Sequence, residues 1–429
     1  MTDKVCPTGQ DVVAHILPIF ALQYLVAVLV QFRNTAYLRI ALLPIMPLIV
    51  LRAFLAIDLS CGLYERAQVN GIFITYFISV IAQVTIWSLA QQLYKRDNVR
   101  GAKSTSIPLA LWNACDLLLN FRGIGWNWSQ GVPIPESSVK TQSRVQFLLF
   151  AVPRAIFFAL GFDAFTEAVR TFFVNTSPLD GDTIFNQSLL PMPRYLQAFE
   201  IAYLSIWLVY FALEWAYHSL AIICIVIFHQ HPSQWPPLFD KPWLSTSLSE
   251  FWGRRWHQVL RYHFSLLGGI PLSYIFGRAG LVLGTFLLIG LFHDIKIRAV
   301  GRGSSSLVEV GFFVMNGVGI LLERVWAKAR DCRVHGAYGW IWTFSWLAIW
   351  GVPMVDLLAK TGCFGYDMFP AGFRPAMSLL SLVLPSGVDK GFYLNCLCFG
   401  VSLSFLVCTL FTSDTFYCFL DSIEFVPWI

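Results

Sequence analysis

His293 closes an apolar stretch, within the sequence Gly290-Leu291-Phe292-His293-Asp294. A neutral imidazole at a site with little water can take a proton from an alcohol, and its unperturbed pKa of about 6.5 makes the exchange reversible near neutral pH. Upstream, Gly277, Gly280 and Gly284 form a stripe that lets a neighbouring helix backbone approach closely. His293 is therefore either a general base on a tightly packed helix or a structural histidine at a membrane interface.

A second polar cluster lies between Trp235 and Phe264, in WPPLFDKPWLSTSLSEFWGRRWHQVLRYHF. Three prolines keep the start of this segment irregular, and Ser249 is predicted to be the N-cap of a helix that runs through Arg261. The side chains of interest on this helix are Trp252, Arg254, Arg255, His257 and Arg261. The helix is either an interfacial anchor of aromatic and basic residues, or its cations receive the phosphates of a nucleotide-bearing donor from the cytosol.

The composition restricts the elements that can position these groups. Hydrophobic residues make up 56% of the 429 residues, charged residues make up 13%, and the mean hydropathy is +0.62. A soluble domain needs roughly a quarter of its residues charged to cover its surface. The sequence therefore excludes a soluble globular protein and predicts an all-α polytopic membrane protein. The ten cysteines show no metal-ligand spacing, so we expect neither a metal site nor a disulfide framework.

Nine stretches reach the roughly 20 apolar residues that a membrane span requires. They lie near 12–31, 38–57, 71–90, 145–169, 195–228, 271–293, 307–327, 337–357 and 390–412. The fifth is too long for one upright crossing, so it is either strongly tilted or broken between Glu214 and His218. We treat residues 1–429 as a single domain with a core near 230–330.

Ionisable side chains gather in the fourth and fifth predicted spans. They are Arg154, Asp163, Glu167, Glu200, Glu214 and His218. Inside a bilayer such groups cost several kcal/mol unless they pair or face water. They are either mutually paired groups that fix helix packing or the lining of a wet central chamber.

Loop charge and glycosylation sequons predict the orientation. The loops 91–144 and 229–270 are basic, whereas the loop 170–194 is nearly neutral and carries sequons at Asn175 and Asn186. Basic loops stay in the cytosol and sequons are modified in the lumen. Both signals predict a lumenal N-terminus, glycans on both asparagines and residence in the endoplasmic reticulum. The basic loop 294–306 falls on the lumenal side in this count, so a span could be miscounted there.

Four blocks of the chain resemble the wax-synthase-like branch of the membrane-bound O-acyltransferase superfamily, and especially fungal acetyltransferases that modify terpenoids and meroterpenoids. The blocks are TSLSEFWGRRWHQVLR (246–261), LIGLFHD (288–294), NGVGILLE (316–323) and DLLLNFRGIGWNW (116–128). Plant wax synthases look like FWGRRWN, with Asn where this chain has His257.

The resemblance implies a helical bundle around a central chamber, in which an acyl group moves from acyl-CoA to a hydroxyl. His293 matches the catalytic histidine of the family and would act as general base, with Asp294 orienting its ring. His257 or Asn316 would stabilise the oxyanion. The expected donor-binding residues are Trp252, Arg254, Arg255 and Arg261. The implied donor is acetyl-CoA and the implied acceptor is a hydrophobic hydroxylated small molecule, with no bound cofactor, metal or nucleic acid.

Other functions stay open from the residues alone. The main alternative is a wax ester or sterol O-acyltransferase that uses long-chain acyl-CoA, because residue types do not fix the acyl length. A small-molecule transporter would also carry polar residues in its spans, but it usually shows inverted repeats, which are not evident here. An inactive structural relative is a further alternative.

Overall fold

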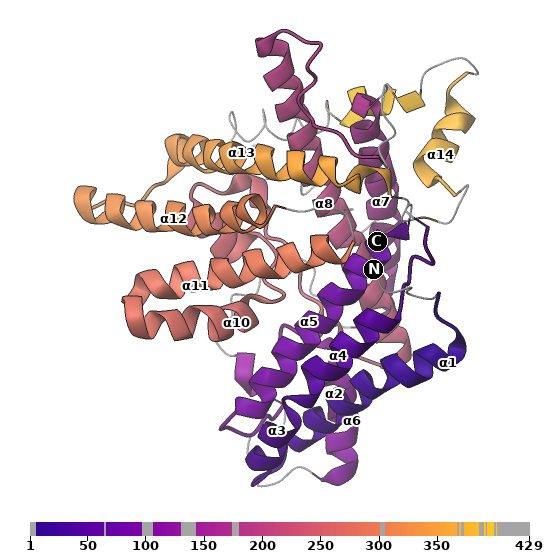
Figure 1. Ribbon diagram of the computed structural model, residues 1–429, viewed down its shortest axis with the longest axis vertical. Coiled ribbons are helices and arrows are strands. Elements are labelled where there is room, and N and C mark those ends of the chain that lie inside the picture. Colours follow the sequence, from indigo (N-terminus) through magenta and orange to yellow (C-terminus); the bar gives the residue numbers. More distant parts are fainter. Residues whose placement is uncertain are drawn as a thin grey trace.

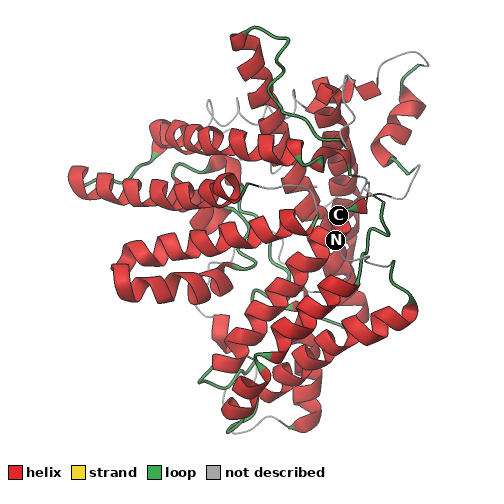
Figure 2. Ribbon diagram, in the orientation of Figure 1, coloured by secondary structure: helices red, strands yellow, loops and turns green. Residues whose placement is uncertain are grey.

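The computed structural model describes residues 6–63, 66–96, 106–129, 143–173, 180–300, 305–366, 369, 373–385, 390–391, 393–398 and 400. Helices dominate these ranges, which contain no extended β-strand (Figure 2). The helices are α1 (Gly9–Asp11), α2 (Leu17–Leu29), α3 (Ala36–Leu42), α4 (Ile45–Ala56), α5 (Gln68–Leu89), α6 (Ile107–Leu119), α7 (Arg144–Arg170), α8 (Pro191–Ile227), α9 (Leu248–Glu250), α10 (Arg261–Phe264), α11 (Ile270–Ala299), α12 (Ser306–Arg330), α13 (Gly336–Lys360) and α14 (Pro375–Val383).

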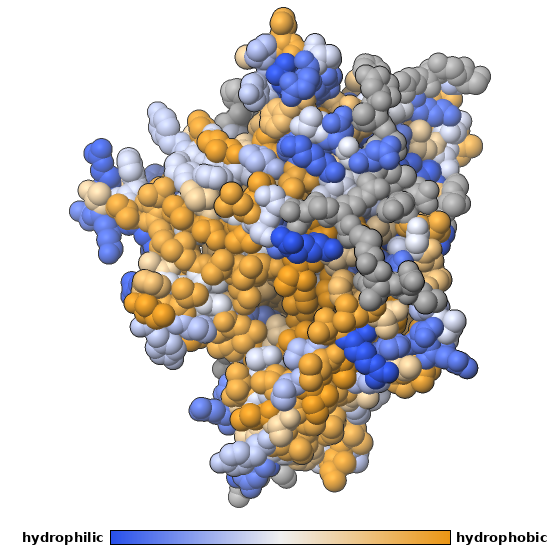
Figure 3. Space-filling model, viewed as in Figure 1, coloured by the Kyte–Doolittle hydropathy of each residue, from blue (hydrophilic) through white to orange (hydrophobic). Residues whose placement is uncertain are grey.

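Eight helical segments in the described part of the chain are long and apolar enough to cross a membrane. They are Gly9–Leu29, Ala36–Ala56, Gln68–Leu89, Arg144–Phe173, Pro191–Ile227, Arg261–Ala299, Ser306–Arg330 and Gly336–Lys360. The prediction of an all-α, multi-pass membrane protein is confirmed. Most of the ninth predicted span, 390–412, lies outside the described residues. Hydrophobic residues cover the middle of the face drawn in Figure 3, and hydrophilic residues gather towards its edges.

The fifth predicted span is one uninterrupted helix, α8, of 37 residues. The predicted alternative of a break between Glu214 and His218 is therefore wrong. Glu214 pairs with the imidazole of His218 one turn later, with Oε2 and Nδ1 3.3 Å apart. In the neighbouring α7, Asp163 and Glu167 both bind Arg374, at 2.6 and 2.9 Å. These contacts favour paired groups that fix packing.

The sixth predicted span, 271–293, has the wrong bounds because the chain reverses at Gly277. This residue has φ 56° and ψ −137°, a conformation that side chains with a Cβ rarely adopt. The segment from Arg261 onward then packs against the segment after the turn, as Figure 1 shows for α10 and α11. A Cβ on Gly284 would lie 2.3 Å from the carbonyl oxygen of Gly268, so the glycine stripe closes a helical hairpin. Arg298, in the basic loop that disagreed with the predicted orientation, consequently lies at the same end of the hairpin as Arg261.

A disulfide joins Cys6 to Cys61, and the sequence analysis did not predict it. Spacing carried no signal because the two residues are 55 positions apart and are brought together by the fold. Both cysteines lie on the predicted lumenal side, where disulfides form and persist.

Three clusters of buried apolar side chains hold the helices together. One joins α2, α4, α5 and α6, and a second joins α7, α8 and α13. The third packs Leu248 and Phe251 against Phe286 of α11, Phe313 of α12 and Leu347 of α13. This third cluster supports the residues that the sequence marks for chemistry.

Candidate active site

The segment that carries the FWGRRW residues is a short helix followed by an extended turn. Ser247 caps α9 by accepting a hydrogen bond from the Glu250 amide at 3.0 Å, and a single π-helical turn, Phe251–Arg255, follows. At Trp256 the backbone is extended, with ψ 156°. The predicted helix from Ser249 to Arg261 is therefore wrong in both its cap and its length.

Hydrogen bonds from a side chain and from a neighbouring backbone segment occupy the carbonyl oxygens that would otherwise accept the next hydrogen bonds of this helix. The carbonyl of Arg255 accepts from the Asp240 amide at 2.9 Å. The Gln258 side chain donates to the carbonyls of Trp252 and Trp256. Once these acceptors are occupied, the chain gains little by continuing the helix through His257.

Two residues of α12 hold the segment in place. Glu323 is 6% exposed, and its carboxylate accepts from the amides of Leu248 at 2.5 Å and Ser249 at 3.0 Å. It also accepts from the Ser249 hydroxyl and from the Trp342 indole. Asn316, two turns earlier on the same helix face, accepts from the Trp252 indole at 3.0 Å. The block 316–323 thus positions the block 246–261.

The His293 ring is oriented by the backbone of its own helix. Nδ1 lies 3.1 Å from the carbonyl oxygen of Ile289, one turn earlier. A carbonyl only accepts, so Nδ1 carries the hydrogen and Nε2 keeps its lone pair. The ring packs on Phe313 of α12, with centroids 4.5 Å apart, and is partly exposed. This tautomer is the one that a general base requires at Nε2.

His257 lies in the same part of the bundle. Its ring packs against Phe239 and Trp256, and it interacts electrostatically with His293. Burial, and then the positive charge of Arg122, lower the pKa of His257 from 6.5 to about 4. The imidazole is therefore neutral at neutral pH, and its buried Nδ1 has no hydrogen-bond partner among the described residues.

Two supporting residues have other contacts than the sequence predicted. Asp294 accepts from Arg298 at 2.8 Å and from the Ser306 hydroxyl at 3.0 Å, which ties α11 to α12. The Ile289 carbonyl orients the His293 ring, and the role expected for Asp294 stays a prediction. Asn316 is 0% exposed and its amide nitrogen donates to the Phe312 carbonyl, so its place favours holding Trp252 over contact with substrate.

The three arginines are not equivalent. Arg255 binds Glu250 at 2.7 Å and the carbonyls of Asp240 and Lys241. Arg261 donates to the Gly253 carbonyl and to Gln258. Arg254 also binds a carboxylate, that of Asp240 at 2.9 Å, but its side chain is 65% exposed. Arg255 and Arg261 thus stabilise the turn, and only Arg254 presents a solvated guanidinium.

Comparison with known proteins identifies acyltransferases that are similar to this chain. Residues 235–315 match the Membrane bound O-acyl transferase family. An acetyltransferase of Arthrinium sp is 24% identical to this chain, over 78% of this chain and 85% of its own length. A long-chain-alcohol O-fatty-acyltransferase of Simmondsia chinensis is 35% identical over 23% of this chain and 30% of its own. An acyl-CoA–sterol O-acyltransferase of Arabidopsis thaliana is 33% identical over 29% of this chain and 37% of its own.

The chain is an acyltransferase, and it is similar to membrane-bound O-acyltransferases. The matched segment begins just before the turn that carries His257, and it ends one residue before Asn316. It therefore contains both histidines of the candidate site together with Phe313, which packs on His293.

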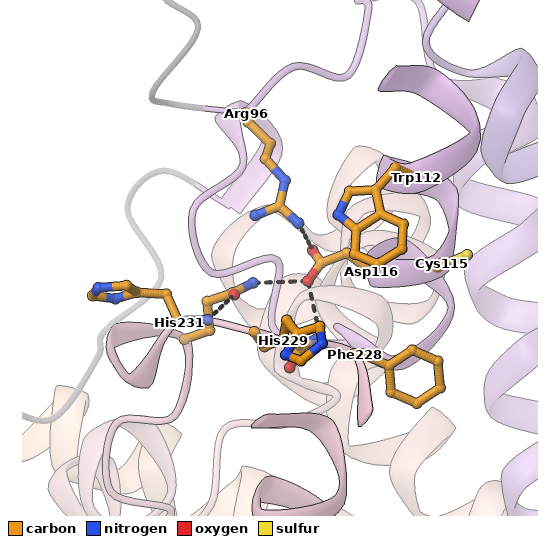
Figure 4. Close-up of a pocket in the computed structure, with 9 residues that line it drawn as sticks. Arg96, Trp112, Cys115, Asp116, Phe228, His229 and His231 are labelled. Atoms are coloured by element: carbon orange, nitrogen blue, oxygen red, sulfur yellow. Dashed lines mark hydrogen bonds and ion pairs between the residues drawn. The ribbon is translucent and has the colours of Figure 1, made fainter. Parts of the chain in front are cut away.

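A separate cavity of about 150 Å³ lies where the fourth block, 116–128, meets the segment after α8 (Figure 4). Asp116 is its centre: one carboxylate oxygen binds Arg96 at 3.0 Å and the Trp126 indole at 2.8 Å. The other accepts from Gln230 and Gln234, both at 2.8 Å. These contacts fix the fourth block of the acyltransferase against residues 230–234.

Sequence reasoning missed Glu323 and Asp116 as positioning residues of this acyltransferase. Both lie in the blocks that carry the resemblance, at the end of NGVGILLE and at the start of DLLLNFRGIGWNW. Their acidic side chains among apolar residues were the available signal, because a buried carboxylate needs several donors.

Proposed function

We propose that the protein is an O-acetyltransferase that moves the acetyl group of acetyl-CoA to a hydroxyl of a terpenoid or meroterpenoid intermediate in fungal secondary metabolism. The observation that carries this proposal is the His293 ring, whose Nδ1 is bound to the Ile289 carbonyl while Nε2 remains free to accept a proton. The acetyl group is supported by the similarity to the Arthrinium acetyltransferase, which matches most of the chain.

In the proposed reaction, Nε2 of His293 removes the hydroxyl proton of the acceptor as its oxygen attacks the thioester carbonyl. The tetrahedral intermediate collapses by breaking the bond between carbon and sulfur. The CoA thiolate then accepts this proton from the imidazolium. The products are the ester, free CoA and neutral His293. The step consumes no oxidant, reductant or metal.

Neighbouring residues support this chemistry in distinct ways. We assign His257 as the donor to the oxyanion, because a neutral imidazole carries one N–H and this ring interacts with His293. Trp252, fixed by Asn316, packs on Phe313, which in turn packs on His293. Arg254 supplies a solvated cation for the CoA phosphates, whereas Arg255 and Arg261 hold the turn.

The test uses membranes that contain the protein, incubated with isotope-labelled acetyl-CoA and a panel of hydroxylated terpenoids. The mass of the product identifies the acceptor and the acyl group together. Palmitoyl-CoA with long-chain alcohols and sterols forms the second arm, because the plant relatives carry those activities in their names. Ester formation only in that arm would replace the acetyltransferase proposal with the long-chain alternative.

His293→Ala tests the mechanism. A general base contributes about 10² to 10⁴ in rate, so kcat should fall by that factor while CoA binding persists. His335→Ala is the matched control, because His335 is exposed and its side chain makes no capping hydrogen bond at the start of α13. Wild-type turnover by a stably folded His293→Ala protein would refute the mechanism.

A further inference from the structure

Arg122, in the fourth block, is a buried cation whose charge is not matched by a carboxylate in the described chain. It is 7% exposed. Nη1 is anchored on the carbonyls of Pro236 and Pro237 at 3.4 and 3.3 Å. Nε and Nη2 have no acceptor among the described residues. No carboxylate of the described residues forms an ion pair with Arg122. A buried guanidinium without an anion is costly, so the site favours an anionic ligand.

The two free groups form one edge of the guanidinium. The Nε–H and Nη2–H bonds of an arginine are parallel and fit two oxygens of one phosphate or carboxylate. The anchored Nη1 and the packed surroundings fix the direction of this edge. Gly123, the next residue, has φ 66°, and a Cβ there would lie 2.5 Å from the Trp128 ring, so the turn that presents Arg122 is tightly packed.

Arg122 is linked electrostatically to the two histidines of the site. Its charge acts on His257, and His257 interacts in turn with His293. The hydroxyl of Tyr217, a neutral group, forms a hydrogen bond with the guanidinium and also donates to the same Pro236 carbonyl. Arg122 is not among the charges that act on His293, so the guanidinium is linked to the reacting ring through His257. In acyl-CoA the phosphates are likewise separated from the thioester by the pantetheine arm.

We propose that the free edge of Arg122 binds a phosphate group of the CoA donor while the thioester lies at His293. This inference rests on the proposed acyl transfer from CoA. It adds a donor-binding residue outside the segment 246–261, to which the sequence had assigned this role. The contacts around Asp116 would then help to position Arg122, because they fix the block that carries it.

The experiment compares two donors in the purified full-length protein: acetyl-CoA, and acetyl-pantetheine, which has no phosphate. Arg122→Gln should raise KM for acetyl-CoA about 10- to 100-fold, the range expected for a charge-assisted phosphate contact. With acetyl-pantetheine, kcat/KM should stay within about twofold of the wild type. Arg194→Gln is the control, since Arg194 also binds backbone carbonyls but lies at the start of α8, outside the four blocks.

A second variant and a direct binding assay keep the test decisive. Arg122→Lys keeps the charge but not the two-point edge, so it should fold and show an intermediate KM for acetyl-CoA. Equal loss with both donors in Arg122→Gln and Arg122→Lys would overturn the proposal in favour of a packing or oxyanion role. Unchanged KM for acetyl-CoA would also overturn it, as expected if a lipid phosphate occupies the site.

Failure of the proposed function gives a different pattern. In that case the wild type transfers no acyl group from any thioester. Titration of free CoA and of pantetheine into the wild type and Arg122→Gln then tests the phosphate site without turnover. Tighter binding of CoA that disappears in the variant supports the site, and equal binding of both compounds by both proteins refutes it.

Discussion

Glu323→Gln should release the turn that carries the FWGRRW residues. Its carboxylate accepts four hydrogen bonds, two of them from the backbone amides of Leu248 and Ser249. A glutamine can keep the acceptor at Leu248 and Trp342, but its NH₂ group then faces the Ser249 amide. The variant leaves one buried N–H without a partner and removes the charge from the remaining bonds.

The magnitude follows from these contacts. An unsatisfied buried donor costs about 1 to 3 kcal/mol, and the loss of charge assistance adds about 1 kcal/mol. We therefore expect the clamped turn to lose about 2 to 4 kcal/mol. Ser249→Ala removes only the hydroxyl contact and should cost about 1 kcal/mol, which makes it the graded control.

Hydrogen exchange measured by mass spectrometry on a peptide that covers 246–256 reports this release directly. Each 1.4 kcal/mol corresponds to about tenfold faster exchange by local opening, so Glu323→Gln should accelerate exchange by about 30- to 1000-fold. A peptide from α5 should exchange as in the wild type. Unchanged exchange in 246–256, together with wild-type kcat/KM, would refute the clamp.

Three further predictions concern other parts of the protein. Arg254→Ala should raise KM for the donor without loss of stability, because the Arg254 side chain is solvated. Arg261→Ala should instead lower the unfolding temperature, because Arg261 is hydrogen-bonded within the turn. The reverse pattern in kinetics and thermal unfolding would contradict this assignment. Because the pKa of His257 falls from 6.5 to about 4 on folding, the unfolded chain binds a proton between these pH values that the folded chain does not. Stability should therefore decrease as pH drops from about 6.5 to about 4, and His257→Asn should flatten this dependence in thermal unfolding; identical pH slopes would refute the assignment. Glycosidase treatment should shift the mobility of the wild type more than that of Asn186→Gln. Asn127→Gln should behave like the wild type, because the Asn127 side-chain amide is hydrogen-bonded to the backbone of Lys95 and Leu93. A glycan at Asn127 would overturn the predicted orientation.

The structure describes only one of the two predicted glycosylation sites. Asn186 is exposed, and its side chain accepts from Ser188 of its own sequon. Asn175 lies outside the described residues, so its modification stays a prediction of the sequence alone.

Composition and hydropathy were sufficient to predict the membrane class and seven of the predicted spans. Apolar runs of span length are a local property, and a bilayer accepts almost no other structure for them. The four blocks and His293 were likewise visible as residue types in order. Local patterns failed at Gly277 and at Trp256, because a reversal inside an apolar run and an early helix end leave the hydropathy unchanged.

The sequence by itself indicated a helical membrane acyltransferase and proposed His293 as its general base. Only the tertiary structure decided which groups position that base and which cations are free. Arg255 and Arg261 look like Arg254 in sequence, yet both are occupied by neighbouring acceptors. The buried Arg122, more than a hundred residues earlier, has two guanidinium nitrogens without an acceptor among the described residues. The physical reason is that the availability of a charge depends on the acceptors that folding brings within hydrogen-bond distance, and these come from distant parts of the chain.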